Sequence, residues 1–381
     1  MYQYTGEYEQ HLRDDWKPIR PLEPFSFYTF TPRPLMDEKF FDMDDELFTL
    51  LTMTHKQLGV LEGMIKHIPD IKIISELMIL IECHFSRLID YDDGYFIELL
   101  KAINTGKREA KNILNIVSAY KYSFEKNVGE IDFSQLCTIA IYGHDSDKKI
   151  RERDKFSFLG QMRTNLKEYN PTAPDKIRSG LADISTFLSD NEKTDVLVKA
   201  ALAHYQFEMI HPYDCYNGVI GRIMFPMILH SYGIRAAPYI RLSEYLYYRK
   251  NDYFAILGST QYSGGYIALI KFFVRGIYES AMEAINKIDQ LHQIIIEDEH
   301  KIVELGSSAK KLMAVYNYFK VHSLSQIRII SNVLEISFNT AAKSVNMLCE
   351  LGILQLENNQ SRHRVYVYDK ILRILANYKT D

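Results

Sequence analysis

The stretch HYQFEMIHPYDCYNGVIGRIMFPMIL, residues 204–229, places a dense set of polar residues between two apolar segments. Apolar helices are expected on both sides, and His211-Pro212 and Asn217-Gly218 mark a turn between them. A turn that opens a helix presents free backbone N–H groups, which suit an anion. The stretch therefore predicts two helices joined by a turn, with a polar site at the turn.

Two side chains give this turn a possible chemistry. His211 stands at its edge, where an imidazole can act as a general base near neutral pH. Arg222, about one turn into the following helix, can contact a phosphate bidentately. A plain structural interpretation stays open, because His-Pro often only breaks a helix, Asn-Gly is often only a turn, and an arginine on a helix is usually solvated.

In spacing, the turn resembles the signature of the Fic family: His-Pro-Phe, any residue, Asp/Glu, Gly, Asn, Gly, Arg, two residues, Arg. Residues 211–222 read His-Pro-Tyr-Asp-Cys-Tyr-Asn-Gly-Val-Ile-Gly-Arg and fit without a gap. Upstream, residues 158–188 resemble the family's flap, its Pro-rich turn and the helix before the motif. Downstream, residues 245–257 and 266–277 resemble the helices after it. A Pro-rich N-terminal arm and a C-terminal winged helix also occur together in one branch of the family.

This resemblance implies transfer of a nucleotide, usually AMP from ATP, to a hydroxyl group of a target protein. It makes His211 the catalytic base and assigns phosphate binding to Arg222 and to the backbone around Asn217 and Gly218. A flap strand would hold the target segment by main-chain pairing. The residues implied for this strand are Phe156, Ser157 and Phe158, and those implied, more loosely, for the base pocket are Tyr247 and Tyr248.

Three positions of the motif depart from the family signature. Cys215 replaces the acid that binds Mg²⁺, and a thiol is a poor ligand for a hard ion, which leaves Asp214 as a weaker alternative ligand. Tyr216 replaces the first glycine and restricts the backbone. Val219 replaces the first arginine and removes a cation. Losing one electrostatic partner commonly costs about 10²–10³ in rate, so three such losses predict little catalysis and weaken the case for ATP and Mg²⁺, the implied cofactors.

Many Fic proteins also carry an inhibitory helix that reads Ser/Thr, three residues, Glu, then Gly/Asn. The matching stretch is IECHFSRLIDYDD, residues 81–93, aligned with Phe85 and Ile89 at the Ser/Thr and Glu positions. On this alignment the inhibitory glutamate is missing. Glu82 and Asp90 are then interpreted as a helix cap and a surface charge.

The rest of the chain predicts a mainly α fold. Residues 1–36 are rich in proline and predict an extended arm on the surface. Helical spacing covers about residues 42–118 and 133–143, and four helices are predicted between Lys176 and Leu305. The predicted class is a Fic-type helical domain with a small β-hairpin flap, followed by a winged helix.

From residue 308 the sequence predicts three helices and two strands, the order of a winged helix. This segment has ten Lys and Arg against five Asp and Glu, which leaves a formal charge of −9 on the first 307 residues of a chain whose total is −4. The local excess favours DNA contact, while a protein partner stays open. The residues predicted to contact DNA are Asn339, Thr340, Lys343, Arg362 and Arg364.

These patterns predict an N-terminal arm and helical region over 1–118, a Fic core over 119–306 and a winged helix over 307–381. No apolar run approaches the ~20 residues of a membrane helix and no signal peptide is evident, so we expect a cytoplasmic protein without a membrane partner. Three functions stay open: a weak nucleotidyltransferase acting on an unidentified target protein, an inactive relative that binds nucleotide or peptide and regulates, and an adaptor. A homodimer also stays open.

Overall fold

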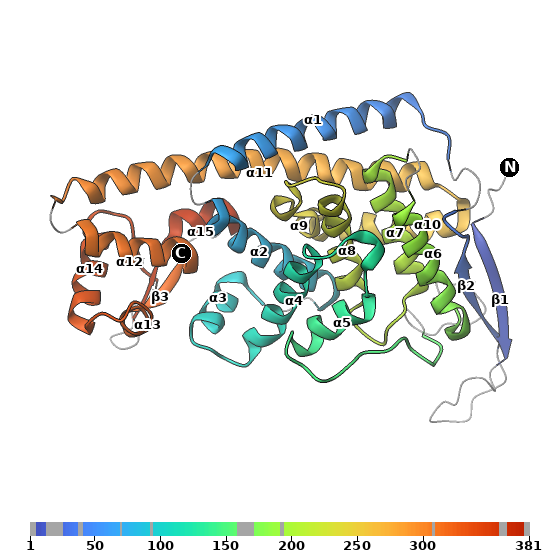
Figure 1. The fold of residues 1–381 in the computed structure, drawn as a ribbon, viewed down its shortest axis with the longest axis horizontal. Helices are drawn as coiled ribbons and strands as arrows, with labels where there is room; N and C mark the ends of the chain where they lie inside the picture. Colours follow the sequence, from blue (N-terminus) through green and yellow to red (C-terminus); the bar gives the residue numbers. More distant parts are fainter. Residues whose placement is uncertain are drawn as a thin grey trace.

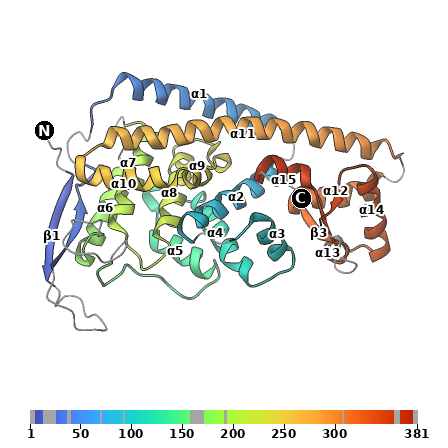
Figure 2. The same ribbon diagram turned by 180° about the vertical axis from the view of Figure 1, so that it is seen from behind.

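The computed structural model describes residues 5–12, 26–36, 41–68, 71–91, 94–157, 171–190, 194–306, 309–357 and 364–376. Over these ranges the chain is mainly helical, with two small antiparallel sheets (Figure 1, Figure 2), which confirms the predicted fold class at that level. None of the described helices is both long enough and apolar enough to cross a membrane.

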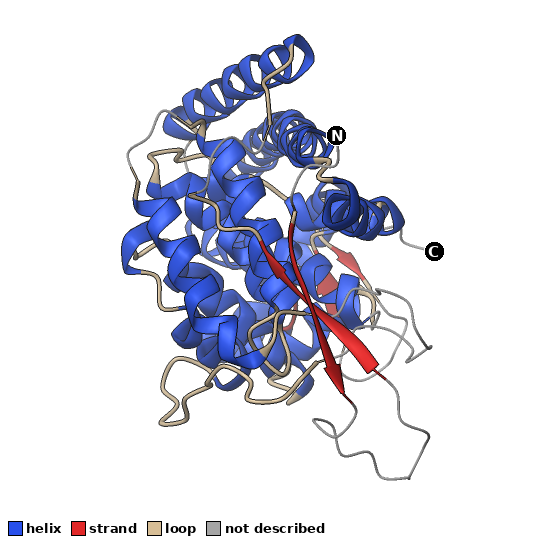
Figure 3. Ribbon diagram, turned by 90° about the vertical axis from the view of Figure 1, so that its right-hand side faces the viewer, coloured by secondary structure: helices blue, strands red, loops and turns tan. Residues whose placement is uncertain are grey.

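The N-terminal segment forms a β-hairpin. Strand β1 (Gly6–Leu12) pairs antiparallel with β2 (Ser26–Pro32), so that Gly6 lies opposite Pro32 and Leu12 opposite Ser26. Figure 3 shows these two long strands in red. The sequence predicted extended chain here but not its pairing, because prolines mark extended backbone without showing which strand lies beside it.

Two long helices lie side by side along one face of the molecule (Figure 1). Helix α1 (Asp45–His67) begins at Asp44, whose carboxylate accepts a hydrogen bond of 2.8 Å from the N–H of Leu47. It packs along α11 (Tyr266–Val303), which has 38 residues and reaches from the N-terminal hairpin towards the C-terminal end of the fold. Lys271 of α11 forms ion pairs with Asp44 and with Glu46 of α1.

The remaining helices of the body lie on the side of α11 that faces away from α1 (Figure 1). They are α2 (Ile71–Tyr91), α3 (Phe96–Asn104), α4 (Glu109–Ser123), α5 (Phe133–Tyr142), α6 (Ile177–Ser189), α7 (Val196–Ile210), α8 (Asn217–Ser231), α9 (Leu242–Tyr248) and α10 (Lys250–Ser263). At the centre, every residue of α7 after Val196 is buried, and α8 is buried almost as fully. The site at the α7–α8 turn therefore rests on the best-packed part of the fold.

Six α-helices, α6 to α11, lie between Lys176 and Leu305, where the sequence predicted four. The break between α9 and α10 occurs at Arg249 alone, with no glycine or proline to mark it. Between α10 and α11 the chain turns at Gly264, which has a left-handed φ of 70° that favours glycine. Because breaks this short leave the hydrophobic spacing almost continuous, the pattern predicted neighbouring helices as one.

Residues 309–376, here called the C-terminal unit, contain four helices and three short strands among their described residues. They are α12 (Ala309–His322), β3 (Leu324–Gln326), α13 (Ile327–Val333), α14 (Phe338–Glu350), β4 (Gln355–Leu356), β5 (Val365–Val367) and α15 (Asp369–Ala376). The strands pair antiparallel in the order β3-β5-β4. The predicted three helices and two strands are present, with β3 and α15 in addition, while the winged-helix assignment stays a prediction.

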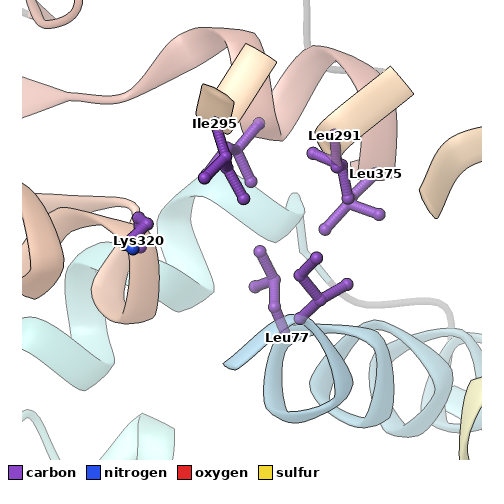
Figure 4. A pocket seen from close by; sticks show the side chains of 7 residues that line it. Leu77, Leu291, Ile295, Lys320 and Leu375 are labelled. Atoms are coloured by element: carbon purple, nitrogen blue, oxygen red, sulfur yellow. The ribbon is translucent and has the colours of Figure 1, made fainter. Parts of the chain in front are cut away.

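The C-terminal unit packs against the body through an apolar seam. Figure 4 shows side chains from four helices lining a small cavity there, including Leu77 of α2, Leu291 of α11 and Leu375 of α15. The main-chain carbonyl of Leu375 accepts hydrogen bonds from Arg241 (2.5 Å) and Lys287 (3.4 Å), which places two cations at the C-terminal end of α15. One buried core thus runs from the body into the C-terminal unit.

Candidate functional site

The turn between α7 and α8 has a left-handed residue at each end. His211 follows α7 with a φ of 49°, and its N–H donates to the carbonyl of Phe207 at 2.9 Å. Tyr216 precedes α8 with a φ of 65°. Non-glycine residues reach this region only at a cost of about 1–3 kcal/mol, so the surrounding structure must hold both. Tyr216 thus keeps a left-handed backbone where the family signature has glycine.

Asn217 fixes the shape of this turn from within. Its side chain is buried, and its Oδ1 accepts a hydrogen bond of 2.8 Å from the N–H of Tyr213. Its Nδ2 donates to the carbonyl of the same residue at 2.6 Å. The amide is thereby committed to the turn, and contact with an anion falls to the backbone. The first N–H groups of α8 have no intrahelical partner, and Tyr216 supplies no side-chain cap.

The start of α8 opens into a cavity of about 690 Å³. Five residues predicted from the sequence line it together: His211, Asp214, Asn217, Gly218 and Arg222. Tyr216 leaves this space open, because its ring lies against that of Tyr91, with centroids 5.8 Å apart, at the cavity wall. The remaining departure, Val219, is fully buried and packs in the core.

Arg222 is already bound by the end of α2. Its side chain is 2% exposed, its Nε donates to Ser86 Oγ at 2.9 Å, and one terminal nitrogen donates to the Ser86 carbonyl at 2.8 Å. The same nitrogen forms an ion pair of 2.7 Å with Asp90. Burial lowers the pKa of Arg222, but Asp90, Tyr253 and Glu208 together outweigh this effect and raise the pKa above its usual range, with Asp90 the largest of the three. A phosphate group would compete with Asp90 for this guanidinium.

Gly218 provides the space for that ion pair. A Cβ atom at this position would lie 2.8 Å from a terminal nitrogen of Arg222 and 3.0 Å from each carboxylate oxygen of Asp90. Real Cβ atoms are essentially never found that close to a heavy atom, so a side chain here would displace the ion pair. The second glycine of the motif is therefore explained by close packing as well as by any ligand.

The interpretation of Asp90 as a surface charge was wrong. The sequence alignment placed Phe85 and Ile89 at the Ser/Thr and acid positions, but Ser86 and Asp90 are the residues that bind Arg222. Asp90 is consequently not a free surface charge. Glu82 was interpreted as a cap, and this is confirmed: its carboxylate accepts hydrogen bonds from the N–H and Oγ of Ser243 at the start of α9.

Behind the ion pair lies a second buried polar layer. His204 Nδ1 lies 2.8 Å from the carbonyl of Gly221, and its Nε2 lies 3.0 Å from the hydroxyl of Tyr253. Burial lowers the pKa of His204 to about 4, so it is neutral at pH 7. Glu208 also lines the cavity, and burial raises its pKa to about 7, against the opposing charge of Arg222. Two carboxyl groups, Asp90 and Glu208, therefore flank one guanidinium.

His211 is held neutral at physiological pH. Burial lowers its pKa to about 4, and the charge of Arg153 acts in the same direction, while Asp90 opposes both. A neutral imidazole has a free lone pair and can accept a proton. A base this weak takes a proton less readily than one with a pKa near 7, so proton removal by His211 is expected to be slow.

The side chains around the cavity do not fit a resident magnesium ion. Mg²⁺ prefers oxygen ligands in octahedral geometry, but Asp90 is bonded to Arg222 and Asp214 is exposed. Burial and the charge of Asp214 raise the pKa of the Cys215 thiol, which leaves it protonated and neutral at pH 7. The described residues also contain no cluster of three or more His, Cys, Asp or Glu side chains able to hold a metal.

The predicted flap strand is absent over the residues that can be described. Residues 151–157 form no strand, and Phe158 lies outside the described residues. Instead, the ring of Phe156 packs against His11 of β1 (4.6 Å between centroids) and Phe27 of β2 (5.2 Å). Packing against the N-terminal hairpin thus decides the position of Phe156, whereas its alternation with Ser157 suggested strand pairing.

The tyrosines placed in the base pocket do not line the cavity. Tyr247 and Tyr248 pack against Phe85, with ring centroids 5.3 Å and 5.8 Å away, on the neighbouring surface of α2 and α9. Aromatic contributions to the cavity come instead from Tyr253 and Phe254 of α10, in addition to Tyr91 and Tyr216.

The residues predicted to contact DNA lie in and near α14. Asn339 and Lys343 are exposed on this helix, and Arg364 is exposed just before β5. Thr340 is half-buried, and its hydroxyl lies 2.8 Å from that of Ser337, the N-cap of α14. Arg362 lies outside the described residues.

Comparisons with known proteins agree with this geometry. Residues 131–229 match the family model described as Fic/DOC family. The chain is 23% identical over 166 residues to a probable protein adenylyltransferase of Aquifex aeolicus (strain VF5), covering 39% of this chain and 51% of that protein. It is 30% identical over 79 residues to the protein adenylyltransferase fic-1 of Caenorhabditis briggsae, covering 19% and 16%. The chain thus spans about half of the length of the first relative and less of the second.

Among solved structures, a Fic family protein from Desulfovibrio desulfuricans G20 is similar in fold, with a TM-score of 0.55 and 17% identity. The similarity covers 87% of this chain and 98% of that one. It therefore extends well beyond the matched segment, into the helices on both sides.

Proposed function

Because residues 131–229 form a Fic/DOC family domain, we propose that this chain carries a nucleotidyl-transfer site whose activity is restrained by Asp90. The proposed reaction is transfer of AMP from ATP to a hydroxyl group of a target protein. Support comes from the names of the curated relatives, which are protein adenylyltransferases. The observation that carries the proposal is that His211 and the start of α8 line one cavity with a bound Arg222.

His211 is the proposed base in this reaction. Its neutral imidazole takes the proton of the target hydroxyl, whose oxygen attacks the α-phosphorus of ATP, and pyrophosphate leaves with the electron pair of the broken P–O bond. The N–H groups at the start of α8 stabilise negative charge that develops on the phosphate oxygens. Arg222 would bind the leaving phosphates once Asp90 has moved away from it.

Asp90 is the proposed restraint. Its carboxylate occupies the guanidinium that a triphosphate needs, and its own charge repels the phosphates. Val219 offers no cation in compensation, because this side chain is apolar and buried. The wild-type chain is therefore expected to transfer AMP slowly, and removal of the Asp90 charge is expected to increase the rate.

The direct test uses ATP labelled at the α-phosphate, with Mg²⁺ or Mn²⁺, and the full chain as its own acceptor or with added cell lysate. We expect faint labelling by the wild type and at least ~10-fold more by Asp90→Asn, because about 1.4 kcal/mol of recovered interaction is a factor of ten. Asp90→Asn combined with His211→Ala is the matched control and should be unlabelled. Equal labelling of Asp90→Asn and this double variant would refute transfer by His211.

A second candidate function follows from the charges at the cavity. Three carboxyl groups, of Asp90, Glu208 and Asp214, line it against the single guanidinium of Arg222, which disfavours a highly charged triphosphate. On this reading the domain binds a less charged nucleotide or a peptide without transfer. Calorimetry with AMP and ADP separates the two functions. A wild type that transfers no AMP in the labelling test, but binds these nucleotides with the same affinity as His211→Ala, would favour a regulator.

The C-terminal unit is proposed to contact DNA through α14 and the segment before β5. Lys343 and Arg364 are exposed there, and lysine and arginine contribute to DNA affinity mainly by neutralising phosphates. Fluorescence anisotropy with a mixed-sequence duplex should show binding that weakens with salt, and each of Lys343→Ala and Arg364→Ala should reduce the salt slope by about one. Binding unaffected by either change would leave a protein partner as the better assignment.

A further inference from the structure

Arg153 is a second buried arginine beside the motif, and no role for it was predicted from the sequence. Its side chain is 4% exposed. The side-chain hydrogen bonds it makes to described residues all go to main-chain carbonyls: Nε to His211 at 2.8 Å, one terminal nitrogen to Lys155 at 2.8 Å, and the other to Thr172 and, at 3.3 Å, to Ile210. This leaves Arg153 without a carboxylate among those hydrogen-bond partners.

The main chain of Arg153 joins the same turn. Its N–H donates to the carbonyl of Pro212 at 2.8 Å. Together with the side chain, one residue thus bonds three successive carbonyls, those of Ile210, His211 and Pro212, where α7 ends. Carbonyls at a helix C-terminus lack intrahelical donors and carry partial negative charge, so a planar cation with five N–H donors suits them.

From this geometry we infer that Arg153 is the positioning residue of His211. Its fork fixes the carbonyl of His211 and thereby the left-handed backbone from which the imidazole projects towards the cavity. The inference rests on the proposed function only in so far as His211 acts as the base. The conformation itself can be measured without any reaction.

Arg153 also connects the turn to the segment that leads to the predicted flap. Its bond to the Lys155 carbonyl holds the chain one residue before Phe156, whose ring packs on the N-terminal hairpin. Arg153 therefore contacts both the turn that carries His211 and the main chain next to Phe156.

The charge of Arg153 has a separate effect on His211. It keeps the imidazole neutral together with burial, and Asp90 acts against it. The other ionisable side chains that line the same cavity are those of Glu208, Asp214 and Arg222, together with Tyr91, Cys215, Tyr216 and Tyr253. Because a lysine keeps the charge but lacks the planar fork, substitution by lysine separates positioning from electrostatics.

The test compares Arg153→Lys with Arg241→Lys. Arg241 is a matched control, because it is also 4% exposed and also donates to a main-chain carbonyl, that of Leu375, but lies at the C-terminal seam. Histidines labelled with ¹³C report the Cα shift and the pKa of His211 by NMR, with His211→Ala assigning its signal. Both substitutions are repeated in the Asp90→Asn background to measure AMP labelling, and the melting temperature of each variant verifies folding.

We expect Arg153→Lys to move the Cα shift of His211 away from the value of a left-handed residue while its pKa stays low. Labelling in the Asp90→Asn background should fall about 10–100-fold with the KM for ATP within about twofold, because small misplacement of a catalytic group has effects of this size. Arg241→Lys should change neither the Cα shift of His211 nor the AMP labelling. Arg153→Gln, which also removes the charge, should in addition raise the pKa of His211.

Two results would overturn the inference. One is a His211 Cα shift that Arg153→Lys leaves unchanged, and the other is an equal change in Arg241→Lys. If Asp90→Asn shows no labelling at all, the proposed transfer fails, while the NMR comparison still decides whether Arg153 positions His211. If Arg153→Lys does not fold, Arg153→Gln takes its place in the NMR comparison, because a single amide group cannot reproduce the bonds of the fork to the carbonyls of His211, Lys155 and Thr172, and the Cα shift of His211 should again move.

Discussion

Two buried arginines lie on opposite sides of the same turn, and their partners differ in kind. Arg222 is bound by a carboxylate and a serine of α2, a helix more than a hundred residues away in the chain. Arg153 is bound by main-chain carbonyls, among them that of His211 in the turn itself and that of Ile210 at the end of α7. A bond to another helix can be released when that helix moves. Bonds to the carbonyls that define a turn are lost only when the turn unfolds.

The electrostatic cost of the two arginines differs accordingly. Burial lowers the pKa of Arg222, but Asp90, with smaller contributions from Tyr253 and Glu208, more than compensates, and the pKa lies above its usual range. Burial lowers the pKa of Arg153 to about 10, and Asp214 compensates only in part. The buried charge of Arg153 is therefore less well compensated than that of Arg222. It is tolerated because its N–H groups donate to carbonyls that would otherwise be buried without partners. The comparison assigns a scaffold role to Arg153 and a switchable role to Arg222.

The largest expected effect comes from removing each arginine in turn. Arg153→Met should lower the free energy of unfolding by about 3–5 kcal/mol, because several buried carbonyls lose their donors at about 1–3 kcal/mol each, partly offset by removal of a buried charge. Arg222→Met should cost only about 1–2 kcal/mol, because Asp90 is at the cavity rim, with 24% of its side chain exposed, and can be hydrated. Urea denaturation at pH 7 measures both. A larger loss for Arg222→Met would reverse the assignment of roles.

The next effect is the contribution of Glu208 to the pH dependence of the free energy of unfolding. Its pKa is raised to about 7 in the folded state from 4.5, so the folded protein binds more protons than the unfolded chain between these values. The contribution of Glu208 to stability is therefore fully present below pH 4.5 and is lost as the pH rises through 7. Relative to Glu208→Gln, the free energy of unfolding of the wild type should fall by about 3 kcal/mol between pH 4 and pH 8.

Comparing the wild type with Glu208→Gln removes the contributions of other ionisable groups to the pH dependence of stability. His204 and His211 both have pKa values lowered to about 4, so their contributions act in the opposite direction and are lost as the pH falls through 4. They cancel in the difference between wild type and Glu208→Gln. Chemical denaturation at several pH values between 4 and 8 gives that difference, and a constant value would show that Glu208 ionises normally.

A smaller effect tests whether Glu208 can replace Asp90 as the partner of Arg222. Asp90→Asn alone should cost about 1 kcal/mol, because Glu208 then ionises more readily beside the guanidinium. Asp90→Asn with Glu208→Gln leaves Arg222 without a carboxylate and should cost about 1–2 kcal/mol more than the sum of the single changes. A double-mutant cycle at pH 7.5 measures this coupling, and strict additivity would show that the two carboxyl groups act independently.

The comparison also shows what could be predicted from the sequence. The helices around residues 204–229 follow from apolar spacing, and the positions of His211 and Arg222 follow from their places in the motif. Asp90 was missed although the signal was present, because Ser86 and Asp90 have the Ser/Thr and acid spacing when the alignment is moved by one residue. The helical pattern alone does not distinguish two alignments that differ by one residue. Only the contact with Arg222 in the folded protein shows which residues of α2 face it.

Arg153 had no comparable signal. Its partners are main-chain carbonyls, which every residue possesses, so no residue type elsewhere in the chain marks them. Long-range packing also decided the pairing of β1 with β2 and the place of Phe156 against that hairpin. Contacts of this kind depend on tertiary structure alone, and local pattern carries little information about them.

The smallest expected effect concerns Tyr216, the left-handed residue at the start of α8. Tyr216→Gly removes the strain of a φ of 65° but gives the unfolded chain more conformational freedom, and each effect is worth about 1 kcal/mol. The free energy of unfolding should therefore change by less than about 1 kcal/mol. The backbone N–H groups at the start of α8 then become more accessible, so affinity for AMP should rise about threefold or more, measured by calorimetry. An unchanged affinity together with a clear loss of stability would show that the Tyr216 ring against Tyr91 stabilises the turn, and would place Tyr216 with Arg153 in the scaffold.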